Sequence, residues 1–285
     1  MPLAARPIGV FDSGIGGLSV LRALRAELPH ERFVYLADSG HAPYGERDAR
    51  FVAQRTHAIT AYLRAQHHIK ALVVACNTAT AAAIHEVRSS HPDLPLVGVE
   101  PALKPAVQRS QTRRIGVIGT RGTLGSEKFR RLHAALAAQA EFILKACDGL
   151  AHAIERSTEQ HLSADAETPE VRALCAGYIG AMGRFGTESG DIDTLVLGCT
   201  HYVFALPTLR ALVGPQVHII DTGAPVARQT RRLLEQSAAL APESLPEDTA
   251  GTVQLLTTGA LAPLQAAAQR WLQLPAQQCE RVEHP

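Results

Sequence analysis

Short apolar segments alternate with longer amphipathic segments along the chain. The short segments are rich in β-branched residues and are apolar throughout, which is typical of strands buried on both faces of a sheet. We expect strands at residues 7–11, 32–37, 70–75, 94–99, 114–119, 141–146, 194–198, 217–221 and 252–257. Between most of them apolar residues recur at helical spacing, as at 18–28 and 51–66. This alternation predicts an α/β fold in which helices cover mainly parallel sheets.

The two halves of the chain resemble each other. IGVFDSGIGGLS at 8–19 is similar to IGVIGTRGTLGS at 115–126, and ACNTA at 75–79 has a counterpart in GCTHY at 198–202. The spacing is longer in the second half, and we expect a loop and an additional helix between Glu155 and Asp193. We therefore predict two similar three-layer domains, related by pseudo-twofold symmetry, with the site in the cleft between them. Residues 1–100 and 222–285 would form the first domain, and residues 101–221 the second.

Composition narrows the class of protein. The chain has 28 basic and 27 acidic side chains, so no charge excess favours nucleic acid or an anionic membrane as a partner. Its five cysteines are an odd number without CxxC spacing, which favours neither a disulfide framework nor a zinc ribbon. We find no apolar run long enough to cross a bilayer and no secretory signal at the start of the sequence. We expect a soluble cytoplasmic protein.

Polar residues follow many of the predicted strands. Ligands of open α/β sheets gather beyond the carboxyl ends of the strands, so these residues are the candidates for a site. They are Asp12, Ser13 and Gly14, then Asp38 and Ser39, then Cys76, Asn77 and Thr78, then Gly119 and Thr120, then Cys147, and then Cys199, Thr200 and His201. No metal-ligand spacing and no nicotinamide, flavin or pyridoxal signature accompanies them. We predict neither a metal nor a cofactor, so that side chains carry the chemistry.

Two cysteines occupy matched positions. Cys76 and Cys199 each follow a predicted strand and precede a polar turn. A thiol at the start of a helix is close to its positive end, which lowers the thiol pKa from about 8.5 toward neutrality and produces a base or nucleophile. A redox disulfide between them is an alternative interpretation. We interpret Cys147, Cys175 and Cys279 as small hydrophobic core residues.

Several neighbouring residues have structural alternatives. Asp12 begins DSGIGG, a loop without the spacing of known phosphate motifs, and Asp at such a turn is commonly a helix cap. His201 is either a structural hydrogen-bonding histidine or a group that tunes Cys199. Tyr44 and Gly45 are also compatible with a simple turn.

Taken with these residues, a series of long motifs resembles the cofactor-independent aspartate/glutamate racemase superfamily, and within it the glutamate racemases. The motifs occur in the family's order over positions 7–227. They are PIGVFDSGIGGLSVL, YLADSGHAPYG, ACNTATAAA, GVEPALKPA, IGVIGT, LVLGCTHY and IIDTGAPVA.

The resemblance implies a two-base racemisation in which one thiol group removes the α-proton of glutamate and the opposite one returns a proton. By motif position the catalytic thiols are Cys76 and Cys199, and Asp12 and His201 tune them. The implied substrate contacts are Asp12, Ser13, Tyr44, Gly45, Asn77, Thr78, Thr200 and His201. Asp38, Glu155 and Thr120 are implied accessory residues, although the segment CDGLAHAIE at 147–155 departs from the more apolar, proline-bearing version usual in the family.

The resemblance also implies a homodimer without a cofactor that supplies D-glutamate for peptidoglycan in the bacterial cytoplasm. A racemase for aspartate or another amino acid is the nearest alternative. A one-thiol decarboxylase of the same superfamily is disfavoured by the presence of both cysteines. A non-catalytic protein that binds a partner such as DNA gyrase is an alternative of another class.

Overall fold

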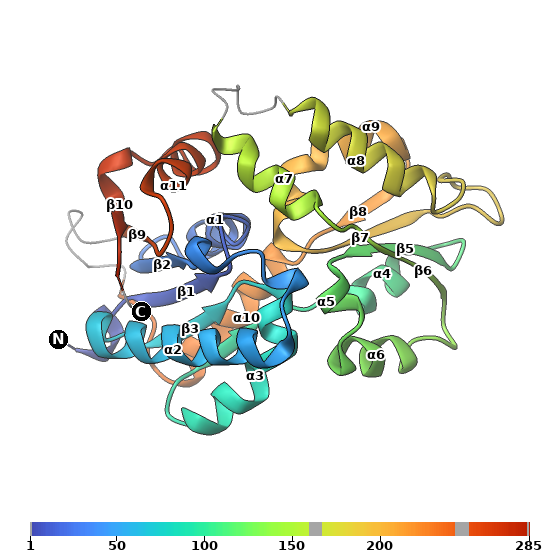
Figure 1. Cartoon of the computed structure of the whole chain (residues 1–285). Coiled ribbons are helices and arrows are strands. Elements are labelled where there is room, and N and C mark those ends of the chain that lie inside the picture. Colours follow the sequence, from blue (N-terminus) through green and yellow to red (C-terminus); the bar gives the residue numbers. More distant parts are fainter. Residues whose placement is uncertain (1, 160–166, 243–250, 284) are drawn as a thin grey trace.

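Two parallel sheets organise the chain (Figure 1). The structure is a computed structural model that describes residues 2–159, 167–242, 251–283 and 285. One sheet has six strands in the order β10-β9-β2-β1-β3-β4, and the other has four in the order β6-β5-β7-β8. The strands are β1 Ile8–Asp12, β2 Phe33–Ala37, β3 Ala71–Val74, β4 Leu96–Gly98, β5 Arg114–Gly119, β6 Glu141–Ala146, β7 Thr194–Gly198, β8 His218–Ile220, β9 Val253–Thr257 and β10 Cys279–Arg281. Every predicted strand is confirmed, whereas the short and polar β10 was not predicted.

Helices connect the parallel strands. The α-helices are α1 Leu18–Glu27, α2 Ala49–His67, α3 Asn77–Ser90, α4 Leu103–Arg109, α5 Arg121–Leu124, α6 Glu127–Ala134, α7 Leu150–Arg156, α8 Pro169–Gly180, α9 Leu206–Val213, α10 Gly223–Gln236 and α11 Leu261–Ala267. Shorter helical turns are η1 Leu3–Ala5, η2 Ser39–His41, η3 Tyr44–Glu46, η4 Ser157–Glu159, η5 Thr200–Ala205, η6 Ala268–Leu272 and η7 Ala276–Gln278. Within the described residues, no helix is both long enough and apolar enough to cross a membrane.

The strand order confirms the duplication predicted from the sequence. The order β2-β1-β3-β4 in the first sheet corresponds to β6-β5-β7-β8 in the second. Cys76 follows β3 and Cys199 follows β7, so the two cysteines occupy equivalent places in the two halves. The expected additional helix is α8, while residues 160–166 of the expected loop lie outside the described part of the chain. The domain limits at 100/101 and 221/222 stay a prediction.

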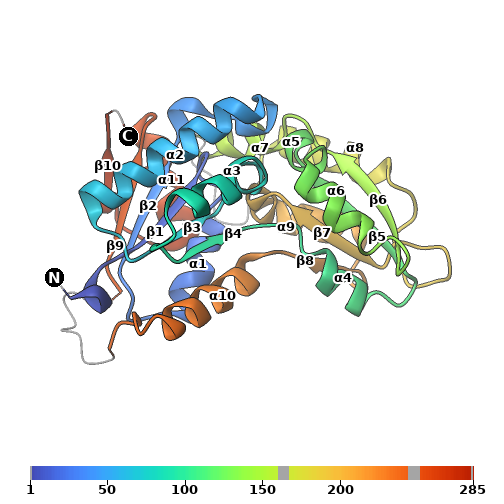
Figure 2. The ribbon, with the colours of Figure 1, turned by 90° about the horizontal axis from the view of Figure 1, so that it is seen from below.

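The first sheet is covered on both faces, as continuous apolar strands require. Ile8 and Val10 of β1 point into a core shared with α1, α10 and α11, whereas Phe11 points into a core shared with α2 and α3. Figure 2 shows α2 and α3 on one side of these strands and α1 and α10 on the other. Because successive side chains of β1 pack against opposite helical layers, the strand is fixed between these layers. Asp12, the last residue of β1, therefore lies at the carboxyl edge of the sheet.

The second sheet is built in the same way. Ile118 and Leu195 pack in a core with α7, α8 and α9, while Ile115 and Val117 pack in another core with α4 and α6. Each half therefore has three layers. The carboxyl ends of β5 and β7 carry Thr120 and Cys199 to the edge where ligands bind in such sheets.

One aromatic pair joins the cores of the two halves. The rings of Phe204 in η5 and Trp271 in η6 are stacked, with centroids 3.7 Å apart and an interplanar angle of 9°. Both side chains pack against the core of the first sheet and against the core of the second. The pair therefore contributes to the stability of the contact between the halves.

Replacing Trp271 by Ala should lower the free energy of unfolding by about 2–3 kcal/mol, because a large and partly buried ring is removed from two cores. Trp271→Phe retains a stacked ring and should lose less than half of that. Chemical denaturation followed by circular dichroism measures both. Equal stability of the wild type and Trp271→Ala would show that the stack does not hold the halves together.

Candidate active site

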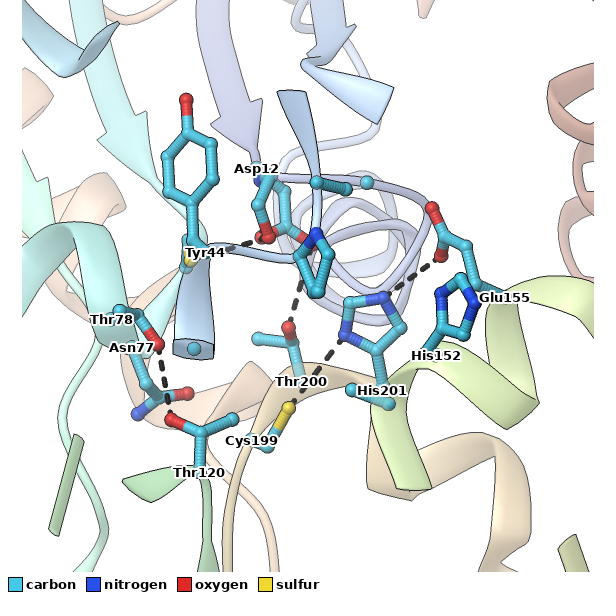
Figure 3. A pocket seen from close by; sticks show the side chains of 17 residues that line it. Asp12, Tyr44, Asn77, Thr78, Thr120, His152, Glu155, Cys199, Thr200 and His201 are labelled. Atoms are coloured by element: carbon cyan, nitrogen blue, oxygen red, sulfur yellow. Dashed lines mark hydrogen bonds and ion pairs between the residues drawn. The ribbon is translucent and has the colours of Figure 1, made fainter. Parts of the chain in front are cut away.

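A cavity of about 40 Å³ lies where the loops beyond both sheets meet. Figure 3 shows the side chains that line it. They belong to Asp12, Ser13, Gly14, Ala42, Pro43, Tyr44, Gly45, Cys76, Asn77, Thr78, Thr120, Ala151, His152, Glu155, Cys199, Thr200 and His201. The predicted catalytic and substrate-contact residues, together with Glu155 and Thr120, are therefore brought together around one small space. Four other candidates that follow strands do not line it, namely Asp38, Ser39, Gly119 and Cys147.

Asp12 fixes the loop that opens α1. It is fully buried at the end of β1, and its carboxylate accepts hydrogen bonds from the backbone N–H groups of Ser13, at 2.7 Å, and Gly17. The interpretation of Asp12 as a helix cap is wrong, because the N-cap of α1 is Gly17 and no side chain caps the helix. The Asp12 carboxylate instead holds the loop before α1, and it lines the cavity. Burial raises the pKa of Asp12 to about 6, although the positive charge of His201 opposes the shift.

Cys76 is the N-cap of α3, and its sulfur accepts a hydrogen bond from the N–H of Ala79 at 3.4 Å. The expectation that this position lowers the thiol pKa is wrong for Cys76. Burial, followed by the negative charge of Asp12, raises the pKa of Cys76 well above its ordinary value. The N–H of Ala79 and the hydroxyl of Ser13 act in the opposite direction but are outweighed. Cys76 is therefore a protonated thiol.

Cys199 belongs to a chain of three polar side chains. Its sulfur lies 3.7 Å from Nδ1 of His201, and Nε2 of His201 lies 2.9 Å from a carboxylate oxygen of Glu155. Burial alone would lower the pKa of His201, but the hydrogen bonds with Cys199 and Glu155 and their negative charges raise it well above its ordinary value. The imidazole is therefore protonated and can hold a negative charge on the Cys199 sulfur.

Glu155 connects the two halves. It lies on α7, in the second half, and its carboxylate accepts a hydrogen bond from the N–H of Ile15 in the first half, at 3.1 Å. The glycines of DSGIGG make this approach possible. A Cβ atom at Gly14 would overlap the Glu155 carboxylate, and one at Gly16 would overlap the His201 ring. The sequence around Glu155 departs from the motif usual in the family that it resembles. The Glu155 side chain nevertheless lines the cavity.

Asp38 does not line the cavity but holds a residue that does. It is fully buried, and it accepts hydrogen bonds from Arg55 at 2.9 Å and from the hydroxyl of Tyr44 at 2.5 Å. Burial would raise the pKa of Asp38, but these bonds and a bond from Thr258 lower it below its ordinary value. Asp38 thus stays ionised and positions the Tyr44 ring from behind.

Hydroxyl and amide groups line the cavity on the side of α3. Thr78 of α3 lies across from Thr120, the N-cap of α5, with 3.1 Å between their hydroxyl oxygens. Asn77 is buried, and neither the oxygen nor the nitrogen of its side-chain amide has a hydrogen-bond partner among the residues that the structure describes. An unpartnered buried amide is costly, and a polar ligand in this cavity would satisfy it.

The interpretation of the other three cysteines as core residues is confirmed. Cys147 and Cys175 lie in the core of the second half, and Cys279 lies in that of the first. All five cysteines, including Cys76 and Cys199, are free thiols. Within the described residues, no group of three or more His, Cys, Asp or Glu side chains is arranged to hold a metal ion.

Sequence reasoning missed four lining residues, namely Ala42, Pro43, Ala151 and His152. His152 is the one that carries a reactive group. It precedes Glu155 by three residues, a spacing that places both side chains on one face of a helix. Once Glu155 is assigned to the site, helical periodicity would therefore have found His152.

The sequence and the fold are similar to those of known proteins. The family model described as Asp/Glu/hydantoin racemase matches residues 16–230. The glutamate racemase of Ectopseudomonas mendocina (strain ymp) is 48% identical over 237 residues, which cover 83% of this chain and 85% of that protein. The glutamate racemase of Cupriavidus pinatubonensis (strain JMP 134 / LMG 1197) is 48% identical over 243 residues, which cover 85% of this chain and 84% of that protein.

Solved structures share the whole fold. The crystal structure of glutamate racemase isoform RacE1 from Bacillus anthracis has a TM-score of 0.81 and 30% identity, and the match covers 98% of each chain. The crystal structure of Escherichia coli glutamate racemase in complex with L-glutamate and the activator UDP-MurNAc-ala has a TM-score of 0.77 and 27% identity, covering 97% of this chain and 98% of that one.

Replacing Asp12 by Asn should make Cys76 react faster with iodoacetamide, roughly three- to tenfold at pH 8.5. The substitution removes a negative charge that disfavours the Cys76 thiolate, and the thiolate is the species that reacts. Mass spectrometry of the Cys76 peptide gives the rate. Asp93→Asn, at an exposed carboxylate paired with Arg64, serves as the control and should leave the rate unchanged. A slower or unchanged rate in Asp12→Asn would contradict this electrostatic account.

Proposed function

This chain belongs to the Asp/Glu/hydantoin racemase family, and from that premise we propose that it is a glutamate racemase, interconverting L- and D-glutamate by proton transfer at Cα. The observation that carries the mechanism is the placement of Cys76 and Cys199. They follow equivalent strands of the two sheets and line the same cavity. Inverting a carbon requires a proton to leave one face and another to arrive on the opposite face, a task suited to two like groups on opposing halves.

The two thiols have different electrostatic neighbours, which suits them to opposite roles. The protonated His201 beside Cys199 supports a thiolate, which can remove the α-proton. Cys76 lies near the Asp12 carboxylate and is protonated, so it can deliver a proton. In this step the Cys199 sulfur gains the proton that leaves Cα, and the Cys76 sulfur loses the proton that Cα receives. The other enantiomer uses the opposite protonation states.

The α-proton of an amino acid is only weakly acidic, so the site must stabilise the carbanion. We assign this to the hydroxyl and amide groups around the α-carboxylate, where negative charge accumulates as the proton leaves. Thr78, Thr120 and the unpartnered amide of Asn77 are the groups in question. Donors fixed in place before the reaction need not reorganise during it. The small cavity also leaves little space for water around the developing charge.

The remaining assignments complete the proposal. Ser13, Tyr44, Gly45 and Thr200 contact the substrate, and their support is their place in the cavity lining. Asp12 and His201 set the protonation of the thiols, and Glu155 orients His201. We also propose a cytoplasmic homodimer without a cofactor that supplies D-glutamate for peptidoglycan and so serves cell-wall growth and cell shape. The naming of the relatives as glutamate racemases supports this role.

The activity is tested by incubating the purified protein with L-glutamate or D-glutamate, without a cofactor, and following circular dichroism. Both solutions should converge on the racemate. Cys76→Ser and Cys199→Ser should each lower kcat by about 10³-fold or more, because each removes an acid–base group. Cys279→Ser, in the edge strand β10, is the matched control and should retain activity. Reaction of aspartate in place of glutamate would overturn the substrate, and no reaction with any amino acid would overturn the function.

Replacing Asn77 by Ala should separate function from stability. The variant should lose about tenfold in kcat/KM, because a donor to the substrate is removed. In the absence of substrate, the variant should nevertheless be as stable as the wild type, or more stable by about 1 kcal/mol, because the buried Asn77 amide, which has no partner among the described residues, is removed. Thermal unfolding and steady-state kinetics measure the two effects. A large loss of stability would show that Asn77 is a packing residue.

A further inference from the structure

Arg55 lies behind the wall of the cavity and does not line it. It belongs to α2, and 17% of its side-chain surface is exposed. Its guanidinium binds the buried Asp38 carboxylate with two hydrogen bonds, from Nε to Oδ2 at 2.9 Å and from Nη2 to Oδ1 at 2.9 Å. A paired contact of this kind is strong and fixed in direction. Arg55 therefore holds the Asp38 carboxylate in one orientation.

The same carboxylate accepts a hydrogen bond from a residue of the cavity wall. The hydroxyl of Tyr44 donates to Oδ2 of Asp38 at 2.5 Å, the oxygen that also accepts from Nε of Arg55. On the other side, the hydroxyl of Thr258 and Nδ1 of His41 lie 2.8 and 2.9 Å from Oδ1. Burial, followed by the negative charge of Asp38, raises the pKa of Tyr44. The Tyr44 hydroxyl therefore keeps its proton and stays a donor to Asp38.

Tyr44 links this network to the cavity. The residue is 1% exposed and lines the cavity, and Figure 3 shows its hydroxyl at the end of the ring that points away from Cys199. The next residue, Gly45, lies close to Thr120 of the second half, because a Cβ atom at Gly45 would be 2.9 Å from Cβ of Thr120. A shift of the Tyr44 hydroxyl would therefore move a part of the wall that is fitted against the other half.

The ionised state of Asp38 depends on Arg55. Burial acts to raise the pKa of Asp38, and the hydrogen bonds from Arg55 are the largest of the effects that oppose it. Since the pKa lies below its ordinary value, Asp38 is ionised at neutral pH and stays ionised as the pH falls. Without Arg55 the pKa would rise, and Asp38 would take up a proton at a higher pH. A neutral carboxyl accepts a hydrogen bond from Tyr44 less strongly than a carboxylate does.

We propose that Arg55 is a positioning residue for racemisation, which holds the Asp38 carboxylate against the Tyr44 hydroxyl and so fixes residues 42–45 in the cavity wall. This inference rests on the proposed function, because the reaction that the wall serves is the racemisation of glutamate. Arg55 acts through Asp38 and Tyr44, since it does not line the cavity itself. Tyr44 and Gly45 are assigned to substrate contact, so the effect of Arg55 is on binding more than on proton transfer.

Steady-state racemisation of L- and D-glutamate tests this role. Arg55→Gln removes the charge and should raise KM about tenfold for both enantiomers, with kcat lowered by less than about threefold. Arg55→Lys keeps a charge without the paired contact and should recover part of the loss. Arg64→Gln is the matched control and should behave as the wild type, because Arg64 of the same helix forms a paired contact with the exposed Asp93.

The division between KM and kcat separates positioning from a purely structural role. If Arg55 only stabilised the fold, Arg55→Gln would reduce the amount of folded protein, and the remaining molecules would keep the KM of the wild type. A lower kcat at unchanged KM would therefore overturn the inference. An Arg55→Lys variant no better than Arg55→Gln would overturn it as well.

A double-mutant cycle locates the path of the effect. Tyr44→Phe should raise KM about as much as Arg55→Gln, and the double variant should raise it no further, because both substitutions act on the same hydrogen bond. An increase in the double variant equal to the product of the two single effects would mean that Arg55 acts by another route, and would overturn the inference.

A fluorine NMR signal from Tyr44 tests the contact without catalysis. The protein is labelled with fluorotyrosine, and Tyr44→Phe identifies the Tyr44 resonance. Every protein compared carries His41→Asn, so that titration of the His41 ring beside Asp38 does not contribute. Between about pH 8 and about pH 5 the resonance should move in Arg55→Gln, as Asp38 takes up a proton, and should stay in place where Arg55 is present.

The outcomes separate the inference from the proposed function. A resonance that responds to pH in the same way with and without Arg55 would overturn the inference, even if the protein racemises glutamate. A wild type that does not racemise glutamate refutes the proposed function, and the Tyr44 signal still decides whether Arg55 positions Tyr44 through Asp38.

Discussion

The site depends on the contacts that the Glu155 carboxylate makes with both halves of the chain. The carboxylate accepts a hydrogen bond from the N–H of Ile15 in the first half and pairs with His201 in the second, at 2.9 Å. This approach is possible only because positions 14 and 16 carry no side chain. The sequence DSGIGG, which does not match a phosphate-binding loop, is therefore explained by close packing. The glycines let a carboxylate and an imidazole from the other half reach the loop.

The site keeps polar groups in conditions that a protein selected only for stability would avoid. Asp12 is fully buried with a raised pKa, Cys76 is a buried thiol beside it, and Asn77 has a buried amide without a partner. Each of these costs free energy of folding. They are held by two three-layer halves, each with an apolar core on both faces of its sheet. Buried polar groups of this kind, converging on one cavity, are characteristic of sites that bind a ligand.

Much of the fold could be predicted from the sequence because parallel strands buried on both faces are continuous apolar runs. The duplication was visible as well, since Cys76 and Cys199 follow equivalent strands. The strand β10 was missed because three residues, two of them charged, give no strand pattern. The protonation of Cys76 was predicted wrongly because a helix start is a local feature, whereas burial and the charge of Asp12 depend on the folded neighbourhood. Asp38 was predicted near the site, but its carboxylate is bound by Arg55, Tyr44 and Thr258 and does not line the cavity.

The central claim is that two thiols on opposing halves exchange protons with the two faces of one carbon. The most direct measurement is the distribution of deuterium at Cα during the first few per cent of conversion of L-glutamate in deuterated water. The two-thiol mechanism predicts deuterium in the D-glutamate formed and much less in the L-glutamate recovered, because the proton delivered to the product comes from a second group that has equilibrated with solvent. Equal deuterium in both enantiomers, or retention of the original proton in the product, would indicate a single base and contradict the account.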